Sequence, residues 1–261
     1  MPELENTREH ALTASASELA DLVQRSTHAE SLALLDNPAC AETHVVALLQ
    51  RKDLLPDLLE EISQRKMLLK CYPIKRALAY HPLTPRLVSV RLLRDLYLMD
   101  LVQLTCLPGV SLELKRAAEN QIKTRLPQLP LGQKITLARR GPAAVAGILL
   151  AEGHEKILAV VLDNACLNET QILKAFSREN LSPAVVQAIA QHEKWSHYYN
   201  IRLALVRNPG ATLSNVLSYL PDLTISDLRD LAAPGIVPER LQKYLQAEVQ
   251  RRLRAAEKLT T

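Results

Sequence analysis

Residues 36–43 read Asp-Asn-Pro-Ala-Cys-Ala-Glu-Thr, and residues 163–170 read Asp-Asn-Ala-Cys-Leu-Asn-Glu-Thr. The Asp-Asn and Glu-Thr pairs occupy the same places in both stretches, at a constant offset in residue number (163 − 36 = 127). The same shift pairs Arg51 with Arg178 and Pro82 with Pro209. A single offset that holds over much of the chain is the signature of an internal repeat. The sequence therefore predicts a tandem duplication.

The composition favours helices throughout the chain. Apolar residues make up 48% of it, but aromatic residues make up only 3%, and there are only seven glycines. An aliphatic core with few aromatic residues suits thin layers of helices, and the scarcity of glycine argues against a sheet-rich fold with many tight turns. We expect an all-α protein.

A shorter rhythm lies within each copy. Asn37-Pro38 and His81-Pro82 recur with an offset of 44 in residue number (81 − 37), and each pair follows an aliphatic stretch. This pattern resembles the HEAT-like and leucine-rich-repeat-variant helical families of bacteria over most of residues 20–253. The resemblance implies an α-solenoid of helical hairpins, with two helices per ~42 residues and about ten to twelve helices in all.

The duplication predicts five segments along the chain. Residues 1–18 form a poorly ordered N-terminal segment, 19–126 the first copy, 127–135 a junction, 136–254 the second copy and 255–261 a C-terminal tail. The junction is placed where two prolines between Leu126 and Gly132 interrupt the helical pattern, because proline lacks the amide proton a helix interior needs.

Charge and cysteine usage narrow the function classes. The net charge is only +4, from 32 basic and 28 acidic residues, which is weaker than the basic stripe of a dedicated nucleic-acid binder. Four scattered cysteines, which lack metal-ligand spacing, are expected to be small buried hydrophobic residues in a reducing compartment: Cys40, Cys71, Cys106 and Cys166. Without a signal-peptide pattern or a long apolar run, we expect a cytoplasmic protein with no membrane partner.

The sequence contains no recognisable catalytic motif. His192 and His197 flank Glu193, but a zinc-protease helix needs its histidines at positions i and i+4, and these are at i and i+5. Glycine-rich loops of the phosphate-binding types are missing. Cys166 has Ala39 as its counterpart, so a nucleophilic role is not supported by the repeat. We expect no catalytic residue, no metal site and no cofactor.

One cluster in the second half is not explained by the repeat. Trp195, the only tryptophan, is followed by His197, Tyr198 and Arg202. Aromatic residues beside arginine are enriched at binding hot spots, which makes this cluster a candidate binding site. A packing cluster at a joint between repeats is the alternative, because aromatic side chains contribute as much to cores.

A second candidate is basic. Lys134, Arg139 and Arg140 precede Gly141-Pro142, and the first copy has Leu12 and Thr13 opposite the arginines. These cations could extend the binding site or contact phosphates. The alternatives are a solvated face and cations that complement the dipole at the C-terminal end of a helix.

Three functions remain compatible with the sequence. The first is a non-enzymatic scaffold that binds a protein or peptide on its concave face, because stacked repeats create extended concave surfaces. The second is a nucleic-acid-binding protein that uses the basic patch of the second half. The third is an enzyme of the HEAT-like DNA glycosylase type, for which Glu193 beside Trp195 is the only candidate carboxylate.

Overall fold

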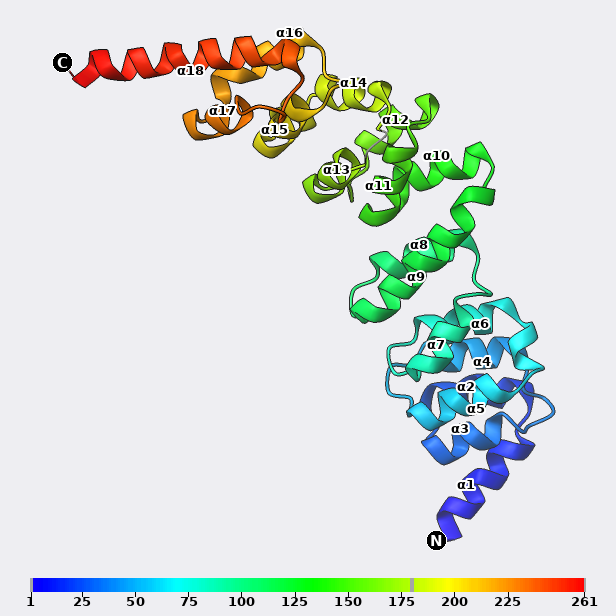
Figure 1. The fold of residues 1–261 in the computed structure, drawn as a ribbon. Helices are drawn as coiled ribbons and strands as arrows, with labels where there is room; N and C mark the ends of the chain where they lie inside the picture. The colour runs from blue at the N-terminus through cyan, green and yellow to red at the C-terminus, as the bar shows by residue number, and fades with distance from the viewer. Residues whose placement is uncertain (1, 179–180, 261) are drawn as a thin grey trace. The chain divides into compact units, whose positions relative to one another are not determined.

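The computed structural model describes the backbone of residues 2–178 and 181–260, and the side chains of residues 7–178 and 181–255. The described residues form 18 α-helices and four short 3-10 helices, with no strand among them (Figure 1). The all-α prediction is confirmed. The expected number of ten to twelve helices is too low, because most of the helices are shorter than three turns.

The chain divides into two units, Met1–Pro127 and Gln128–Thr261, so the boundary falls inside the predicted junction at 127–135. The helices of unit 1 are α1 (Pro2–Thr13), α2 (Ala16–Arg25), α3 (His28–Leu34), α4 (Glu42–Leu48), α5 (Pro56–Gln64), η1 (Leu68–Lys70), α6 (Tyr72–Tyr80), α7 (Arg86–Leu92), α8 (Leu98–Cys106) and α9 (Leu112–Arg125). The short helix η2 (Leu126–Gln128) covers the boundary.

The helices of unit 2 follow the same order. They are α10 (Leu131–Arg140), α11 (Ala143–Glu152), α12 (Glu155–Leu162), α13 (Glu169–Phe176), α14 (Pro183–Gln191), η3 (Trp195–His197), α15 (Tyr199–Arg207), α16 (Leu213–Tyr219), η4 (Leu220–Asp222), α17 (Ile225–Leu231) and α18 (Glu239–Thr260). From α2 to α9, the first residue of every helix of unit 1 corresponds to the first residue of a helix of unit 2 at the offset seen in the sequence (143 − 16 and 239 − 112 both equal 127).

The shorter rhythm differs from the expectation. The helices α3, α5, α7 and α9 begin at positions 28, 56, 86 and 112, so successive pairs of helices are spaced by 28, 30 and 26 in residue number (56 − 28, 86 − 56, 112 − 86). The predicted repeat of two helices per ~42 residues is wrong. Asn37-Pro38 and His81-Pro82 do not mark the ends of successive repeats of two helices. Three α-helices, α4, α5 and α6, lie between them.

The two ends of the chain are also more regular than expected. Residues 2–13 form α1, which packs on α3, and Ala11 is completely buried. The buried amide of Asn37 donates hydrogen bonds to the carbonyl oxygens of Ala11 and Ala14, at 2.9 and 3.0 Å. These bonds hold the end of α1 in place, so most of the segment 1–18 belongs to the folded unit. The predicted tail 255–261 continues α18 as far as Thr260, and position 261 lies outside the described residues.

Within each unit the helices form two layers. In unit 1, α1 packs on α3 and α3 on α5, while α2 packs on α4 and α4 on α6 (Figure 1). In unit 2, α10, α12 and α14 form one such series, and α11, α13 and α15 form the other. Leucine, isoleucine, valine and alanine side chains fill the space between the layers. Burial of these aliphatic faces is the main stabilising contribution to each unit.

Polar side chains from later helices cap the C-terminal ends of earlier ones. The last four carbonyl groups of a helix have no partner within it, and cationic donors complement the helix dipole at that end. The Arg125 guanidinium donates to the carbonyl oxygens of Leu93, Arg94 and Leu96 after α7, at 3.3, 2.6 and 2.7 Å. Arg252 does the same for three carbonyl groups after α16.

Candidate functional site

Trp195 lies in the core and not on the surface. Its side chain is 1% exposed, and its indole Nε1 donates a hydrogen bond to the carbonyl oxygen of Leu162, at 2.8 Å. A binding anchor would need a partly exposed ring, which Trp195 does not have. We therefore assign Trp195 to the core packing of unit 2.

Comparison with unit 1 explains the presence of a tryptophan at position 195. At the corresponding helix end of unit 1, Arg65 donates to the carbonyl oxygen of Leu35 at 2.6 Å and pairs with Asp36 at 2.7 Å. Unit 2 has His192 in place of Arg65, and His192 contacts Asp163 at 3.2 Å. The carbonyl group at the end of α12 receives its donor from Trp195 instead. The tryptophan thus performs the capping that the arginine performs in unit 1, and no partner is needed to account for it.

The other residues of the predicted cluster have mixed roles. Arg202 is largely buried and fully engaged, because it donates to the Ser196 carbonyl oxygen at 2.6 Å and pairs with Asp222 at 2.5 Å. Its counterpart Lys75 pairs with an aspartate in the same way. His197 and Tyr198 are exposed beside this core. Only these two residues of the aromatic cluster are accessible to a partner.

The predicted basic residues also separate. Lys134 forms an ion pair with Glu152 at 3.0 Å, so its charge is balanced. Arg139 and Arg140 are exposed in the last turn of α10, where they complement the helix dipole. No contact between these three residues and the aromatic cluster is found among the described residues. The structure therefore does not join them into one site.

The cysteine prediction is wrong for two of the four residues. Cys71 is buried and Cys40 is half-buried, and burial raises the pKa of both thiols. Cys106 and Cys166 are exposed. Cys166 lies in the turn after α12, where its backbone amide donates to the side-chain oxygen of Asn164 at 2.7 Å. The turn needs the backbone of Cys166 and leaves its side chain at the surface.

The glycosylase alternative has no supporting geometry. Glu193 is exposed and the Trp195 ring is buried, so the two do not form a carboxylate in an aromatic cleft. Within the described part of the chain, no group of three or more histidine, cysteine, aspartate or glutamate side chains is placed to hold a metal ion. Nor is any described helix long and apolar enough to cross a membrane.

An exposed apolar surface in unit 1 was missed by the sequence analysis. We define the α7 patch as Leu83, Leu87, Val90 and Leu112. Leu87 and Val90 lie on one face of α7, and Leu83 lies in the turn before it. Leu87 is 84% exposed, and Leu112, the first residue of α9, is 62% exposed. An ion pair of 2.9 Å between Arg86 and Glu113 holds the start of α9 beside α7.

Comparison with unit 2 shows that the fold does not require three of the four patch residues to be apolar, whereas the fourth, Val90, has the exposed Leu217 as its counterpart. The counterparts of Leu83, Leu87 and Leu112 are Gly210, Ser214 and Glu239. The same helices form in unit 2 with these small or polar residues. This difference between the units was the sequence signal that could have identified the α7 patch.

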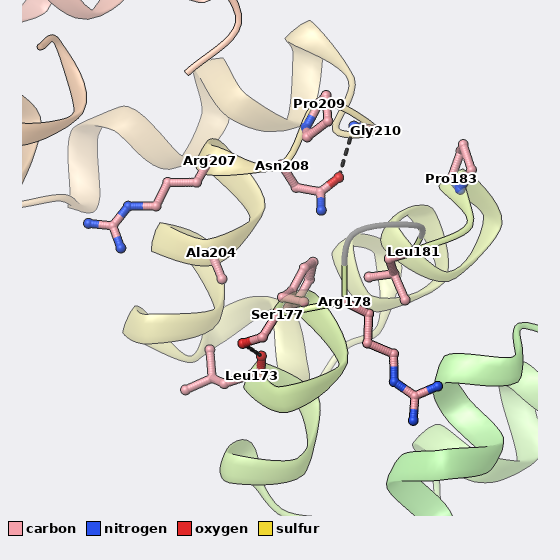
Figure 2. A pocket seen from close by; sticks show the side chains of 11 residues that line it. Leu173, Ser177, Arg178, Leu181, Pro183, Ala204, Arg207, Asn208, Pro209 and Gly210 are labelled. Atoms are coloured by element: carbon pink, nitrogen blue, oxygen red, sulfur yellow. Dashed lines mark hydrogen bonds between the residues drawn. The ribbon is translucent and has the colours of Figure 1, made fainter. Parts of the chain in front are cut away.

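Unit 2 contains a cavity of about 670 Å³ at the C-terminal ends of α13 and α15 (Figure 2). Its lining is part apolar and part polar and includes two arginines; the lining residues include Phe176, Arg178, Leu181, Ala204, Arg207, Asn208 and Gly210. Figure 2 shows the guanidinium groups of Arg178 and Arg207 pointing away from the cavity in different directions. The volume lies within the range typical of small-molecule sites.

Comparison of the chain with protein-family models, with curated proteins and with solved structures finds no match. The function therefore has to be inferred from the surfaces and cavities themselves.

Proposed function

We propose that the chain is a non-enzymatic helical-repeat scaffold, built by tandem duplication, that binds a protein or peptide partner. The proposal includes a solenoid stack of HEAT-like type within each unit, in keeping with the sequence resemblance. The recurrence of helix starts at one constant offset supports the duplication. So do equivalent hydrogen bonds in the two units: the side chain of Asn37 donates to the end of α1, and that of Asn164 donates to the end of α10.

The single observation that carries the binding function is the α7 patch. Leu87 is 84% exposed where the corresponding residue of unit 2 is a serine. Contiguous exposed apolar side chains mark interaction sites, because water contact at such a surface is unfavourable. Unit 2 shows that the helical framework forms with small or polar residues at Leu83, Leu87 and Leu112. The apolar residues of unit 1 are therefore retained for a contact outside the unit.

The test exchanges the patch for residues that the chain itself uses in unit 2. The variant Leu87→Ser with Leu112→Glu should reduce affinity for the partner at least tenfold, as measured by quantitative capture from the native lysate. Its melting temperature should stay within a degree or two of the wild type. Ser214→Leu in unit 2 is the matched control. If the double variant captures the same proteins in the same amounts, the α7 patch is not the binding surface.

Nucleic-acid binding is the second candidate, and one observation favours it. Counted over the two units, residues 1–127 contain 16 basic and 16 acidic residues, and residues 128–261 contain 16 basic and 12 acidic residues. The whole net charge of +4 therefore belongs to unit 2, where Arg139 and Arg140 are exposed. Phosphate contacts weaken steeply with salt through counterion release. Wild-type binding to mixed nucleic acid that weakens steeply between low and physiological salt, together with weaker binding and a shallower salt dependence in an Arg139→Gln, Arg140→Gln variant, would support this candidate.

A further inference from the structure

The two helices that carry most of the α7 patch lie side by side and run in the same direction. Their starts are joined by the ion pair between Arg86 and Glu113, at 2.9 Å. Their ends are joined by Arg125, the last residue of α9, whose guanidinium donates to the carbonyl oxygens of Leu93 and Leu96 just after α7, at 3.3 and 2.7 Å. Because start meets start and end meets end, positions along α7 and α9 can be compared directly.

Exposed arginines follow the patch on both helices. On α7, Arg91 lies four residues after Leu87, and on α9, Arg116 lies four residues after Leu112. Side chains at this spacing share one face of a helix and lie about 6 Å apart along its axis. Arg94 follows in the turn after α7, and all three arginines are exposed. We define them as the cationic border; it lies on the C-terminal side of the leucine on each helix.

The arginines of the cationic border have no carboxylate partner within the described part of the chain. Arg91 donates to the carbonyl oxygen of Ser63 at 3.3 Å, an uncharged acceptor that leaves the charge of the guanidinium unbalanced. The side chains of Arg94 and Arg116 make no hydrogen bond or ion pair with any residue that the structure describes. All three charges are therefore available to a partner.

The carboxylates nearby do not neutralise the border. Glu113 is paired with Arg86, and Asp95 is paired with Lys75 at 2.8 Å. The only other acidic residue of α9 is Glu119, whose single charge offsets at most one of the three arginines. The surface beside the α7 patch therefore keeps a surplus of positive charge.

Unit 2 lacks the arginines of α7 as well as its exposed leucine. The positions of α16 and its following turn that correspond to Leu87 and the two arginines carry uncharged residues: Ser214, Ser218 and Pro221. Arg116 alone has a basic counterpart, Lys243, which lies over the ring of Tyr244 at 5.0 Å. On α7 the apolar and the cationic residues thus differ from unit 2 together, as expected if one partner contacts both.

We propose that the α7 patch and the cationic border together bind an amphipathic helix of a partner protein, whose apolar face ends in glutamate or aspartate side chains. The leucines cover the apolar face, and the arginines pair with the carboxylates one to two turns further along it. Complementary charge selects an acidic segment over a basic one. Leu87, which is 84% exposed, favours protein over nucleic acid, because phosphates offer an apolar side chain no contact. This inference rests on the proposed function and adds the chemistry of the partner.

Two synthetic helical peptides with the same leucine face test the charge preference. The acidic peptide carries three glutamates at one end of that face, and the basic peptide carries lysines in their place. Fluorescence anisotropy with the full-length protein should show the acidic peptide binding at least tenfold more tightly, because the exchange turns attraction to the arginines into repulsion. The difference should shrink as salt rises, because exposed charges are screened. Equal binding of the two peptides, or no binding of the acidic one, would overturn the inference.

Variants of the cationic border assign the contact. Arg94→Glu with Arg116→Glu should invert the preference, so that the basic peptide binds more tightly. The melting temperature should stay close to that of the wild type, because neither side chain contacts a described residue. Lys174→Glu with Arg229→Glu, at exposed positions of unit 2, is the matched control and should keep the wild-type preference. A preference for the acidic peptide that survives in the Arg94, Arg116 variant would refute the assignment.

A variant of the patch separates this inference from the proposed function. Leu87→Ser with Leu112→Gln removes the apolar contact without adding charge and should weaken both peptides. If it does so although the wild type binds the two peptides equally, the patch binds apolar segments of any charge; the proposed function then stands and this inference falls. If the variant binds the acidic peptide as tightly as the wild type, the leucines take no part, and the inference also falls. Displacement of the acidic peptide by an equal concentration of mixed-sequence nucleic acid would overturn the choice of a protein partner.

Discussion

Replacing Trp195 by leucine tests whether the tryptophan serves as a structural cap. Leucine is the residue at the corresponding position of unit 1, Leu68, so the change imports a side chain that the other unit already tolerates there. In unit 2 it should nevertheless destabilise the fold. The buried indole is lost, and the Leu162 carbonyl oxygen loses its donor at 2.8 Å, because His192 interacts with Asp163 and not with that oxygen.

The expected cost has two parts. Truncating a large buried aromatic side chain to alanine costs about 3–5 kcal/mol, and leucine retains part of that burial, which leaves roughly 1–3 kcal/mol. Leaving a buried acceptor without a donor costs about 1–3 kcal/mol more. Trp195→Leu should therefore lower the free energy of unfolding by about 2–6 kcal/mol. This figure is a large fraction of the stability of a typical domain, which is about 5–15 kcal/mol.

The second substitution His192→Arg makes the test specific. It restores the arginine of unit 1, whose counterpart Arg65 donates to Leu35 at 2.6 Å and pairs with Asp36. In the Trp195→Leu background it should recover about 1–3 kcal/mol, whereas in the wild type, where the indole already caps Leu162, it should recover much less. Urea unfolding followed by far-ultraviolet circular dichroism measures the four proteins, because the fluorescence of the single tryptophan is lost in two of them.

The refuting results are well defined. If Trp195→Leu costs less than about 1 kcal/mol, the ring does not contribute as a buried side chain should. If the two substitutions are additive, the arginine and the tryptophan do not serve the same carbonyl group, and the capping explanation is wrong.

Three further outcomes are expected. Arg252→Met removes the donor for three carbonyl groups after α16 and should lower the free energy of unfolding by about 1.5–3 kcal/mol. Urea unfolding followed by Trp195 fluorescence measures this change, and an unchanged midpoint would contradict the prediction. Asn164→Asp places a carboxyl group against the two carbonyl oxygens to which the Asn164 amide now donates. Burial raises the pKa of that carboxyl group, so the loss of stability should be smallest below about pH 4 and should grow as the pH rises. A loss of stability that does not change with pH would contradict this prediction. Burial and the hydrogen bond to Asp100 raise the pKa of Tyr72 to about 12; because an unfolded tyrosine titrates at about pH 10, stability should fall as pH rises from there to about 12, and Tyr72→Phe should flatten this part of the pH profile.

Much of the architecture could be predicted from local patterns in the sequence. The all-α class, the constant offset between helix starts and the boundary near Pro127 follow from residue order and composition, because helix formation depends on the spacing of apolar side chains and on prolines at the corners. The length of the shorter repeat could not be predicted in the same way. The Asn-Pro and His-Pro corners mark only every third helix, and most of the intervening corners carry no such pair.

The candidate sites depended on distances that residue order does not contain. In the sequence Trp195 differed from its counterpart and resembled a binding anchor. Its ring is buried because it packs beside the end of α12, where its indole nitrogen donates to the carbonyl oxygen of Leu162. Residue order alone does not show that these two residues lie close together. The change from His81 to Asn208 is a small difference in sequence. In the tertiary structure the His81 ring lies against the Arg51 carbonyl oxygen, whereas Asn208 accepts a hydrogen bond from the Gly210 amide and lines a cavity.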